Sequence, residues 1–132
     1  MKSVIALLAA SAFASTAFAA NPIEKLPSGV IVEQLKAGTG PQPTASDVVR
    51  VNYRGTLTNG TEFDSSAQHG GPATFPLGQV IPCWTQGVQK MKVGGKAKLT
   101  CPAATAYGSR AVGTIPPNSD LIFEVELVGI GQ

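Results

Sequence analysis

Conventional catalytic groups are sparse in this chain. The one histidine, His69, lies in a glycine-rich loop and has no obvious nucleophile as a partner. The chain contains no phosphate-binding loop, no G-x-S-x-G turn and no H-E-x-x-H pair. Among the few acids, only Asp64, beside Phe63, lies in an apolar context. These residue types argue against triad-type nucleophilic catalysis.

Aromatic side chains indicate a different kind of site, a dry binding pocket. Trp84, the one tryptophan, lies in the segment 79–91, where an apolar run leads into a predicted short helix. Its indole either fills the core or forms the floor of a pocket, and core packing is the alternative for the other aromatic residues too. Apolar walls with a few placed donors are the usual design of a ligand site. The candidates are Tyr53, Phe63, Phe75, Trp84, Tyr107 and Phe123.

The charge balance argues against a nucleic-acid partner. Ten basic and eight acidic residues give a formal net charge of +2 over 132 residues. This excess of positive charge is too small to indicate binding of a nucleic acid. The lysines between positions 90 and 98 either form an anion patch or lie on a solvated surface, and we favour the surface. Two cysteines and the distant His69 do not supply the four ligands of a structural zinc site, so we expect no metal and no cofactor.

Cys83 and Cys101 are the two cysteines. In an exported protein two cysteines suggest one disulfide. The alternative is two buried thiols that are not bonded to each other. A bridge closes a loop of about 18 residues and contributes roughly 3 kcal/mol on the chain-entropy model.

The N-terminal 19 residues are typical of a cleaved signal peptide. Lys2 precedes an alanine-rich apolar run, which ends in Ala17-Phe18-Ala19. We expect cleavage after Ala19 and a periplasmic mature protein, with a retained membrane anchor as the alternative. Residues 20–28 then form a short tail, and residues 29–132 form one domain.

Alternating and helical apolar patterns predict the elements that position these side chains. Thr58-Asn59-Gly60 is a hairpin turn, and a helix begins at Pro82 and ends at Gly94-Gly95. The predicted fold is α+β, an antiparallel sheet with one apolar face covered by a single short helix. A long loop covers 102–120. Strands are expected near 30–35, 49–54, 61–66, 96–101 and 121–127.

Short motifs follow one another in a fixed order from about Gly29 to Ile130. They are V-N-Y-R-G at 51–55, F-D-S-S at 63–66, L-G-Q-V-I-P-C-W at 77–84, G-V-Q-K-M-K-V-G at 87–94, K-L-T at 98–100, A-Y-G at 106–108 and I-P-P at 115–117, leading to L-I-F-E-V-E-L at 121–127. In these motifs the chain resembles the FKBP-type peptidyl-prolyl cis-trans isomerases. The resemblance implies a strongly twisted antiparallel sheet wrapped around one short α-helix, in agreement with the pattern above.

The resemblance also implies a site. Trp84 becomes the pocket floor, and the Ile81 N–H and the Tyr107 hydroxyl become donors toward carbonyl groups of a substrate or macrolide. Asp64 either favours the twisted amide electrostatically or anchors the pocket through a tyrosine, and we favour the anchor. The implied walls are Tyr53, Phe63, Val80, Ile81, Tyr107, Ile115 and Phe123, and Phe75 is a further substrate-binding candidate.

The function implied by the resemblance is isomerisation of X–Pro bonds in unfolded or partly folded polypeptides. We expect a monomer, with a macrolide as a candidate inhibitor. The alternative is a proline-segment-binding module or holdase chaperone with little turnover. The loop between Ser66 and Phe75 lacks a basic residue often found there, Ala73 replaces a common aromatic residue, and the loop between Tyr107 and Ile115 is slightly short. These three departures from the family pattern are expected to change macrolide affinity and substrate preference more than isomerase activity.

Overall fold

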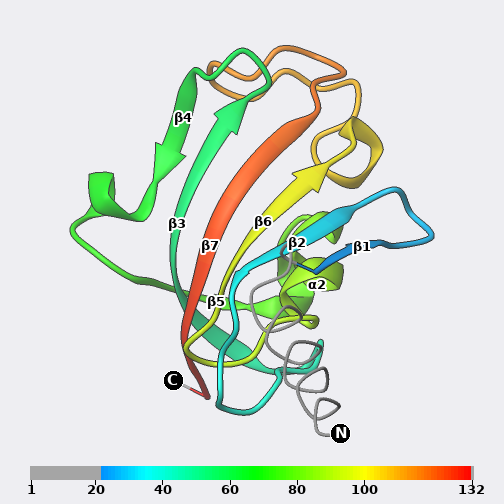
Figure 1. Ribbon diagram of the computed structural model, residues 1–132. Coiled ribbons are helices and arrows are strands. Elements are labelled where there is room, and N and C mark those ends of the chain that lie inside the picture. The colour runs from blue at the N-terminus through cyan, green and yellow to red at the C-terminus, as the bar shows by residue number, and fades with distance from the viewer. Residues whose placement is uncertain (1–21, 132) are drawn as a thin grey trace, which may run out of the picture.

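One antiparallel sheet curls around a short α-helix in the computed structural model, which describes residues 22–131 (Figure 1). The predicted signal peptide at 1–19 lies outside these residues. The strand order is β1-β2-β6-β7-β3-β4, and β5 also pairs with β3. The predicted α+β class is confirmed. The elements are β1 (Ile23–Lys25), β2 (Ile31–Lys36), β3 (Val48–Leu57), β4 (Glu62–Ser65), β5 (Ala73–Pro76), α2 (Pro82–Val88), β6 (Lys96–Cys101) and β7 (Leu121–Ile130).

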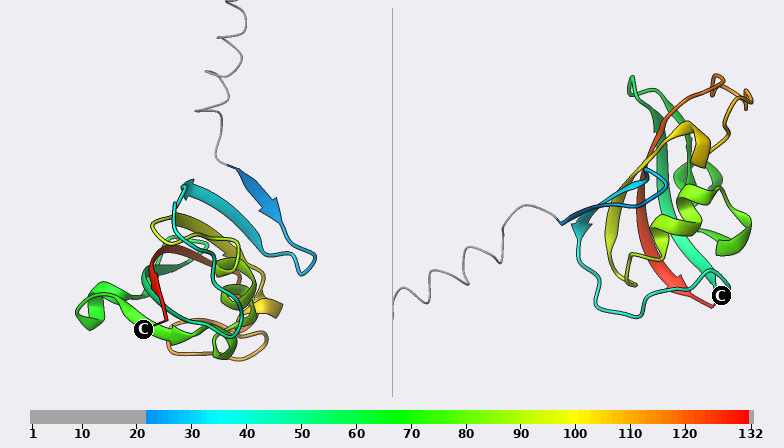
Figure 2. Two further views of the ribbon diagram at one scale, coloured as in Figure 1. Left: turned by 90° about the horizontal axis from the view of Figure 1, so that it is seen from below. Right: turned by 90° about the vertical axis from the view of Figure 1, so that its right-hand side faces the viewer.

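The inner face of the sheet carries the core. Alternation along β7 buries Leu121, Phe123 and every second residue to Leu127, and it leaves Glu124 exposed. The register sets Phe123 opposite Leu99 of β6 on one side and opposite Gly55 of β3 on the other. The sheet curves strongly, as two further views show (Figure 2). Phe123 therefore lies in the middle of a concave face.

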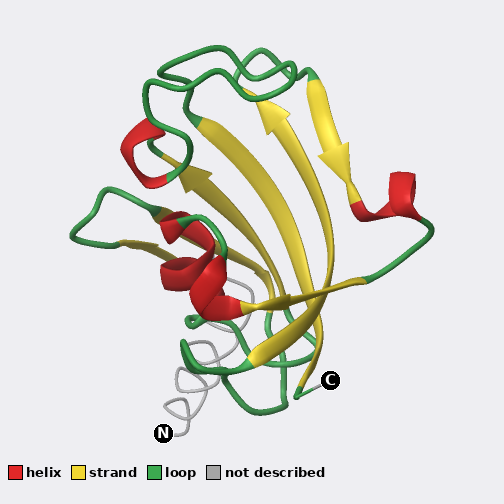
Figure 3. Cartoon of the chain, turned by 180° about the vertical axis from the view of Figure 1, so that it is seen from behind, coloured by secondary structure: helices red, strands yellow, loops and turns green. Residues whose placement is uncertain are grey.

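Helix α2 packs against this concave face (Figure 3). Pro82 occupies its first turn, where no amide donor is needed, and Ile81 precedes it in an extended conformation. A Cβ atom on Gly87 would lie 2.9 Å from a methyl carbon of Leu99, so a glycine allows close contact with β6. The α-helix ends at Val88, before the predicted Gly94, because the Lys90 N–H closes a tighter turn onto the Gly87 carbonyl.

Two segments contain more structure than the sequence predicts. Ile23–Lys25, within the expected tail, pairs with β2 as an edge strand. The loop 102–120 contains a 3-10 helix at Ala103–Thr105 and a bridge between Val112 and Ile115. Across residues 22–131, no helix has the length and apolar character needed to cross a bilayer.

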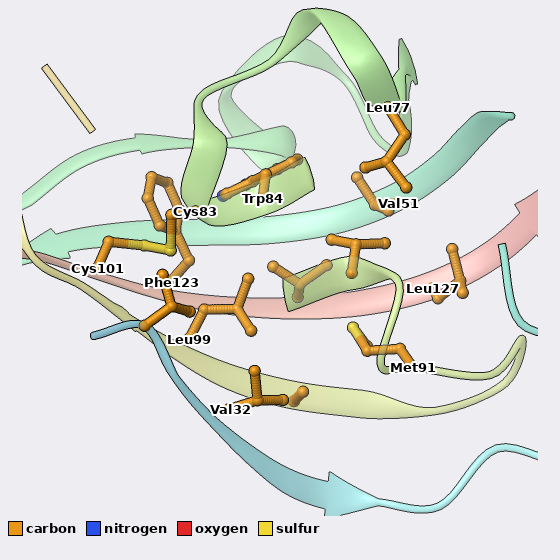
Figure 4. Close-up of a cluster of buried hydrophobic side chains, with 14 of the residues drawn as sticks. Val32, Val51, Leu77, Cys83, Trp84, Met91, Leu99, Cys101, Phe123 and Leu127 are labelled. Carbon is orange, nitrogen blue, oxygen red and sulfur yellow. A yellow bond between two sulfur atoms is a disulfide. The ribbon is translucent and has the colours of Figure 1, made fainter. Parts of the chain in front are cut away.

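A disulfide fastens α2 to the sheet. Cys83 of α2 is bonded to Cys101 of β6, with their Cα atoms 5.6 Å apart, and both residues are fully buried. Figure 4 shows this bond beside Trp84 and Phe123 in the buried cluster. Of the two alternatives for the cysteines, the disulfide is confirmed, and it fixes the residue directly before Trp84.

Candidate binding pocket

A cavity of about 380 Å³ opens where the N-terminus of α2 meets β3, β4 and β7. The structure brings all the predicted pocket residues to it except Ile115, which is 5% exposed and packs in the core. Sequence reasoning missed Gln79, although it directly precedes Val80. The lining residues are Tyr53, Phe63, Asp64, Phe75, Gln79, Val80, Ile81, Trp84, Tyr107 and Phe123.

Trp84 is held on three sides by aromatic edges. The centroid of its ring lies 5.3 Å from that of Tyr53, 5.4 Å from Phe75 and 5.3 Å from Phe123, with interplanar angles between 77° and 89°. Such edge-to-face contacts are favourable and restrict the ring. Trp84 belongs to the core cluster and also lines the cavity, so its indole packs in the core with part of its surface at the cavity. Its indole N–H is buried and has no hydrogen-bond partner within residues 22–131.

Gly55 leaves room for the second aromatic pair of the pocket. The rings of Phe63 and Phe123 meet edge to face, with centroids 5.5 Å apart. A Cβ atom on Gly55 would lie 2.6 Å from the tip of Phe63 and 2.8 Å from Phe123, distances at which the rings must shift.

Gly55→Ala is therefore expected to reduce the affinity of the cavity for a ligand more than the stability of the fold, because the displaced rings border the cavity. Overpacking of this kind costs roughly 1–3 kcal/mol of stability. Gly129→Ala is the matched control, since a Cβ atom on this β7 residue meets nothing within 4 Å. Denaturant unfolding and peptide titration measure the two effects, and equal behaviour of the two variants would contradict the steric account.

Two unengaged hydrogen-bond donors border the cavity. The Ile81 carbonyl accepts from the N–H groups of Trp84 and Thr85 at the start of α2. Neither the Ile81 N–H nor the Tyr107 hydroxyl bonds to another residue in the described part of the chain. The wall therefore presents donors suited to carbonyl groups of a ligand.

Asp64 is the charged group of the wall. The Tyr53 hydroxyl donates to Asp64 Oδ2 at 2.8 Å, and the Ser65 N–H donates to Oδ1 at 2.9 Å. His69 Nε2 lies 2.8 Å from Oδ1, a contact that sequence reasoning missed. Burial acts to raise the pKa of Asp64, but the hydrogen bonds outweigh it and hold this pKa below its ordinary value. Burial, together with Asp64, raises the pKa of Tyr53 well above its usual range.

The lowered pKa of Asp64 predicts a loss of stability in acid. A carboxyl group with a lower pKa in the folded state stabilises that state above its unfolded pKa of about 3.9, and this contribution disappears as pH falls through the folded value. Asp64→Asn is expected to be less stable than the parent chain near neutral pH, and the difference should shrink below about pH 4. Urea unfolding between about pH 2 and 7 measures it. A difference independent of pH would contradict this assignment.

A larger hollow of about 560 Å³ lies elsewhere, beside α2 and the segment 26–28. Its lining contains no aromatic residue and consists of Leu26, Pro27, Ser28, three glutamines and Lys90. No group of side chains within residues 22–131 is arranged to hold a metal ion. The smaller aromatic cavity, which combines a ring platform with placed donors, is therefore the better candidate site.

Comparison with known proteins agrees with the fold. A sequence model described as FKBP-type peptidyl-prolyl cis-trans isomerase matches residues 40–128. The chain is 53% identical over 108 residues to the FKBP-type peptidyl-prolyl cis-trans isomerase FkpA of Aeromonas hydrophila, covering 82% of this chain and 40% of that protein. It is 48% identical over 106 residues to the outer membrane protein MIP of Legionella longbeachae, covering 80% of this chain and 46% of that protein.

A solved structure has the same fold as this chain. The crystal structure of FkpA from Escherichia coli superposes with a TM-score of 0.80 at 40% sequence identity, and the match covers 95% of this chain and 59% of that one. The chain thus spans less than half the length of these curated relatives. Since the family model covers most of the domain, the chain belongs to the family of FKBP-type peptidyl-prolyl cis-trans isomerases.

Proposed function

We propose that this chain catalyses cis–trans isomerisation of X–Pro bonds in unfolded or partly folded polypeptides, without a covalent intermediate. The observation that carries the proposal is the cavity itself, which has Trp84 as its floor and the Ile81 N–H and Tyr107 hydroxyl at its wall. Its volume of about 380 Å³ falls within the ordinary range of ligand pockets, about 300–1,000 Å³. We assign the proline ring to the face of Trp84.

The chemistry suits such a cavity. Resonance gives the amide C–N bond partial double-bond character and a rotation barrier of about 18–20 kcal/mol. No bond is made or broken during rotation, so no nucleophile is needed. Water stabilises the charge separation of the planar amide, and an apolar pocket removes that stabilisation. Turnover follows when the pocket binds the twisted amide more tightly than the planar one.

The catalytic set in this proposal is Tyr53, Phe63, Asp64, Ile81, Trp84, Tyr107 and Phe123, with Val80 and Phe75 as substrate-binding neighbours. Asp64 serves as an anchor for Tyr53, because its carboxylate already accepts the tyrosine hydrogen bond at 2.8 Å. Ile115 supports the loop from inside the core. We propose no cofactor, a monomeric state and inhibition by a macrolide that fills the cavity.

We propose a periplasmic location, with cleavage after Ala19. The buried disulfide supports it, because such bonds persist in oxidising compartments. A relative named as an outer membrane protein supports it as well. Cell fractionation followed by N-terminal sequencing tests this proposal, and a cytoplasmic protein that retains residues 1–19 would refute it.

A refolding assay distinguishes an isomerase from a holdase chaperone when the client protein has a slow phase that is limited by X–Pro isomerisation. Substoichiometric protein should accelerate the slow phase, and a macrolide should suppress the acceleration. If the slow phase is unchanged while stoichiometric protein prevents aggregation, the holdase alternative is correct.

A further inference from the structure

Three consecutive residues of one segment line the cavity. They are Gln79, Val80 and Ile81, and they lie between β5 and α2, where the chain forms a 3-10 helix at Leu77–Gln79 and then an extended turn. This segment carries the Ile81 N–H, which the proposed function assigns to a carbonyl group of the substrate. Ile81 is also the N-terminal cap of α2, but an isoleucine side chain has no oxygen with which to cap a helix. The position of the wall therefore depends on other contacts.

Thr85 of α2 holds both ends of this wall segment, residues 77–81. Its hydroxyl donates to the Leu77 carbonyl at 2.7 Å, and its backbone N–H donates to the Ile81 carbonyl at 3.1 Å. Residues 78–80 form the span between the two anchored residues. One residue of the helix therefore fixes the wall segment at its beginning and at its end.

The hydroxyl contact of Thr85 is not the ordinary local one. A threonine within a helix commonly donates its hydroxyl to the carbonyl four residues earlier, which here belongs to Ile81. The Thr85 hydroxyl instead reaches Leu77, eight residues earlier in the sequence. Leu77 is fully buried and belongs to the same cluster as Trp84 (Figure 4). The contact therefore joins α2 to a residue outside the helix.

The two anchors differ in their dependence on Thr85. The Ile81 carbonyl also accepts from the Trp84 N–H at 2.9 Å, so the Thr85 N–H is one of two helical donors there. At the other end, the Leu77 N–H donates to the Asp47 carbonyl at 2.9 Å, which leaves the Thr85 hydroxyl as the side-chain donor that joins Leu77 to α2. Removing only this hydroxyl releases the Leu77 end from the helix and keeps the backbone bonds of α2.

Thr85 itself lies outside the lining of the cavity. Its side chain is half-buried, and the residue directly before it, Trp84, is the floor. The Thr85 hydroxyl thus connects the helix that carries the floor to the segment that carries one wall. Any effect of this hydroxyl on a ligand must act through the position of that wall.

We propose that Thr85 is a positioning residue of the pocket, whose hydroxyl fixes the wall segment and thereby directs the Ile81 N–H toward a carbonyl group of the substrate. This inference rests on the proposed isomerase function. A donor that is held in place before the substrate arrives loses less conformational entropy on binding. Removal of the hydroxyl should therefore lower kcat/KM in protein that is still fully folded.

The test compares kcat/KM for an X–Pro peptide in the full chain and in variants of Thr85. Thr85→Val keeps the branched shape and removes the hydroxyl, and it should lower kcat/KM by about 2- to 10-fold, as expected for one hydrogen bond. Thr85→Ser keeps a hydroxyl and should recover most of this loss. Unfolding curves establish that each variant is folded at the assay temperature.

Two matched controls remove comparable hydrogen bonds at other places. Gln89→Ala, on the turn that follows α2, removes a side-chain bond to the Thr85 carbonyl. Ser119→Ala removes a hydroxyl that donates to the Pro116 carbonyl at 2.7 Å. Both variants should keep the kcat/KM of the parent chain. The proposal is overturned if Thr85→Val is as active as the parent, if Thr85→Ser is no more active than Thr85→Val, or if the controls lose as much activity.

A measurement on the free protein keeps the test independent of turnover. Backbone ¹⁵N relaxation should show residues 78–81 to be ordered in the parent chain and in Thr85→Ser, and less ordered in Thr85→Val. Equal order in the parent and in Thr85→Val overturns the role of Thr85. A parent chain that shows the difference in order but does not accelerate X–Pro isomerisation refutes the isomerase function instead.

Discussion

Trp84→Leu is expected to lower kcat/KM for X–Pro isomerisation by about 10- to 100-fold. The indole supplies the floor of the cavity, and full burial of a large apolar group contributes about 1.5–3 kcal/mol. Leucine retains apolar volume at the position but presents no flat surface to a proline ring. The measurement is steady-state turnover of a proline peptide at a temperature where unfolding curves show each variant to be folded.

Trp84→Phe is the matched control. It preserves an aromatic ring among Tyr53, Phe75 and Phe123, and it removes an indole N–H that has no partner among the described residues. Losing an unpartnered buried donor carries no hydrogen-bond cost. The phenylalanine variant should keep most of the activity. Equal activity of the leucine variant and the parent chain would show that Trp84 is only a core residue.

Replacement of both Cys83 and Cys101 with alanine is expected to lower stability by about 3 kcal/mol. The bond closes a segment with a sequence separation of 18, and chain-entropy arguments give this magnitude for a loop of that length. The melting temperature should fall by roughly 10–20 °C. Calorimetry or circular dichroism measures the shift.

The effect on activity should be smaller than the effect on stability. Cys83 directly precedes Trp84 in α2, but the aromatic contacts of the indole do not involve either sulfur. Below its melting temperature the double variant should therefore retain turnover. Parent protein kept reduced by a thiol reductant, without alkylation of the buried sulfurs, provides a second comparison with the same sequence. A melting temperature within a few degrees of the parent would show that the disulfide contributes little.

The sequence predicted most of the fold because its signals are local. Period-2 alternation located β6 and β7, and the T-N-G turn located the hairpin between β3 and β4. The strand at Ile23–Lys25 escaped prediction, since three exposed residues carry no alternation and depend on pairing with β2. The end of α2 was placed too late because Met91 is buried whether or not the helix continues to it.

The pocket was predictable mainly through the resemblance of motifs. Residue type alone did not distinguish an aromatic side chain of the core from one of the pocket wall. In the structure, Trp84 packs in the core cluster and also lines the cavity. Ile115 was assigned to the wall, but it does not line the cavity. Its backbone pairs with Val112 inside the loop 102–120, and its side chain packs in the core. The Asp64–His69 contact depends on a 3-10 helix and a left-handed glycine, which apolar periodicity does not reveal.

Exchange spectroscopy on a proline peptide tests the central claim, that this aromatic cavity accelerates X–Pro isomerisation. The cis and trans forms give separate NMR signals, and uncatalysed exchange takes tens to hundreds of seconds. Substoichiometric protein should produce exchange cross-peaks on a much shorter timescale, and Trp84→Leu should weaken them. Exchange that stays at the uncatalysed rate, while the peptide shifts the signals of pocket residues, would show binding without catalysis and would contradict the claim.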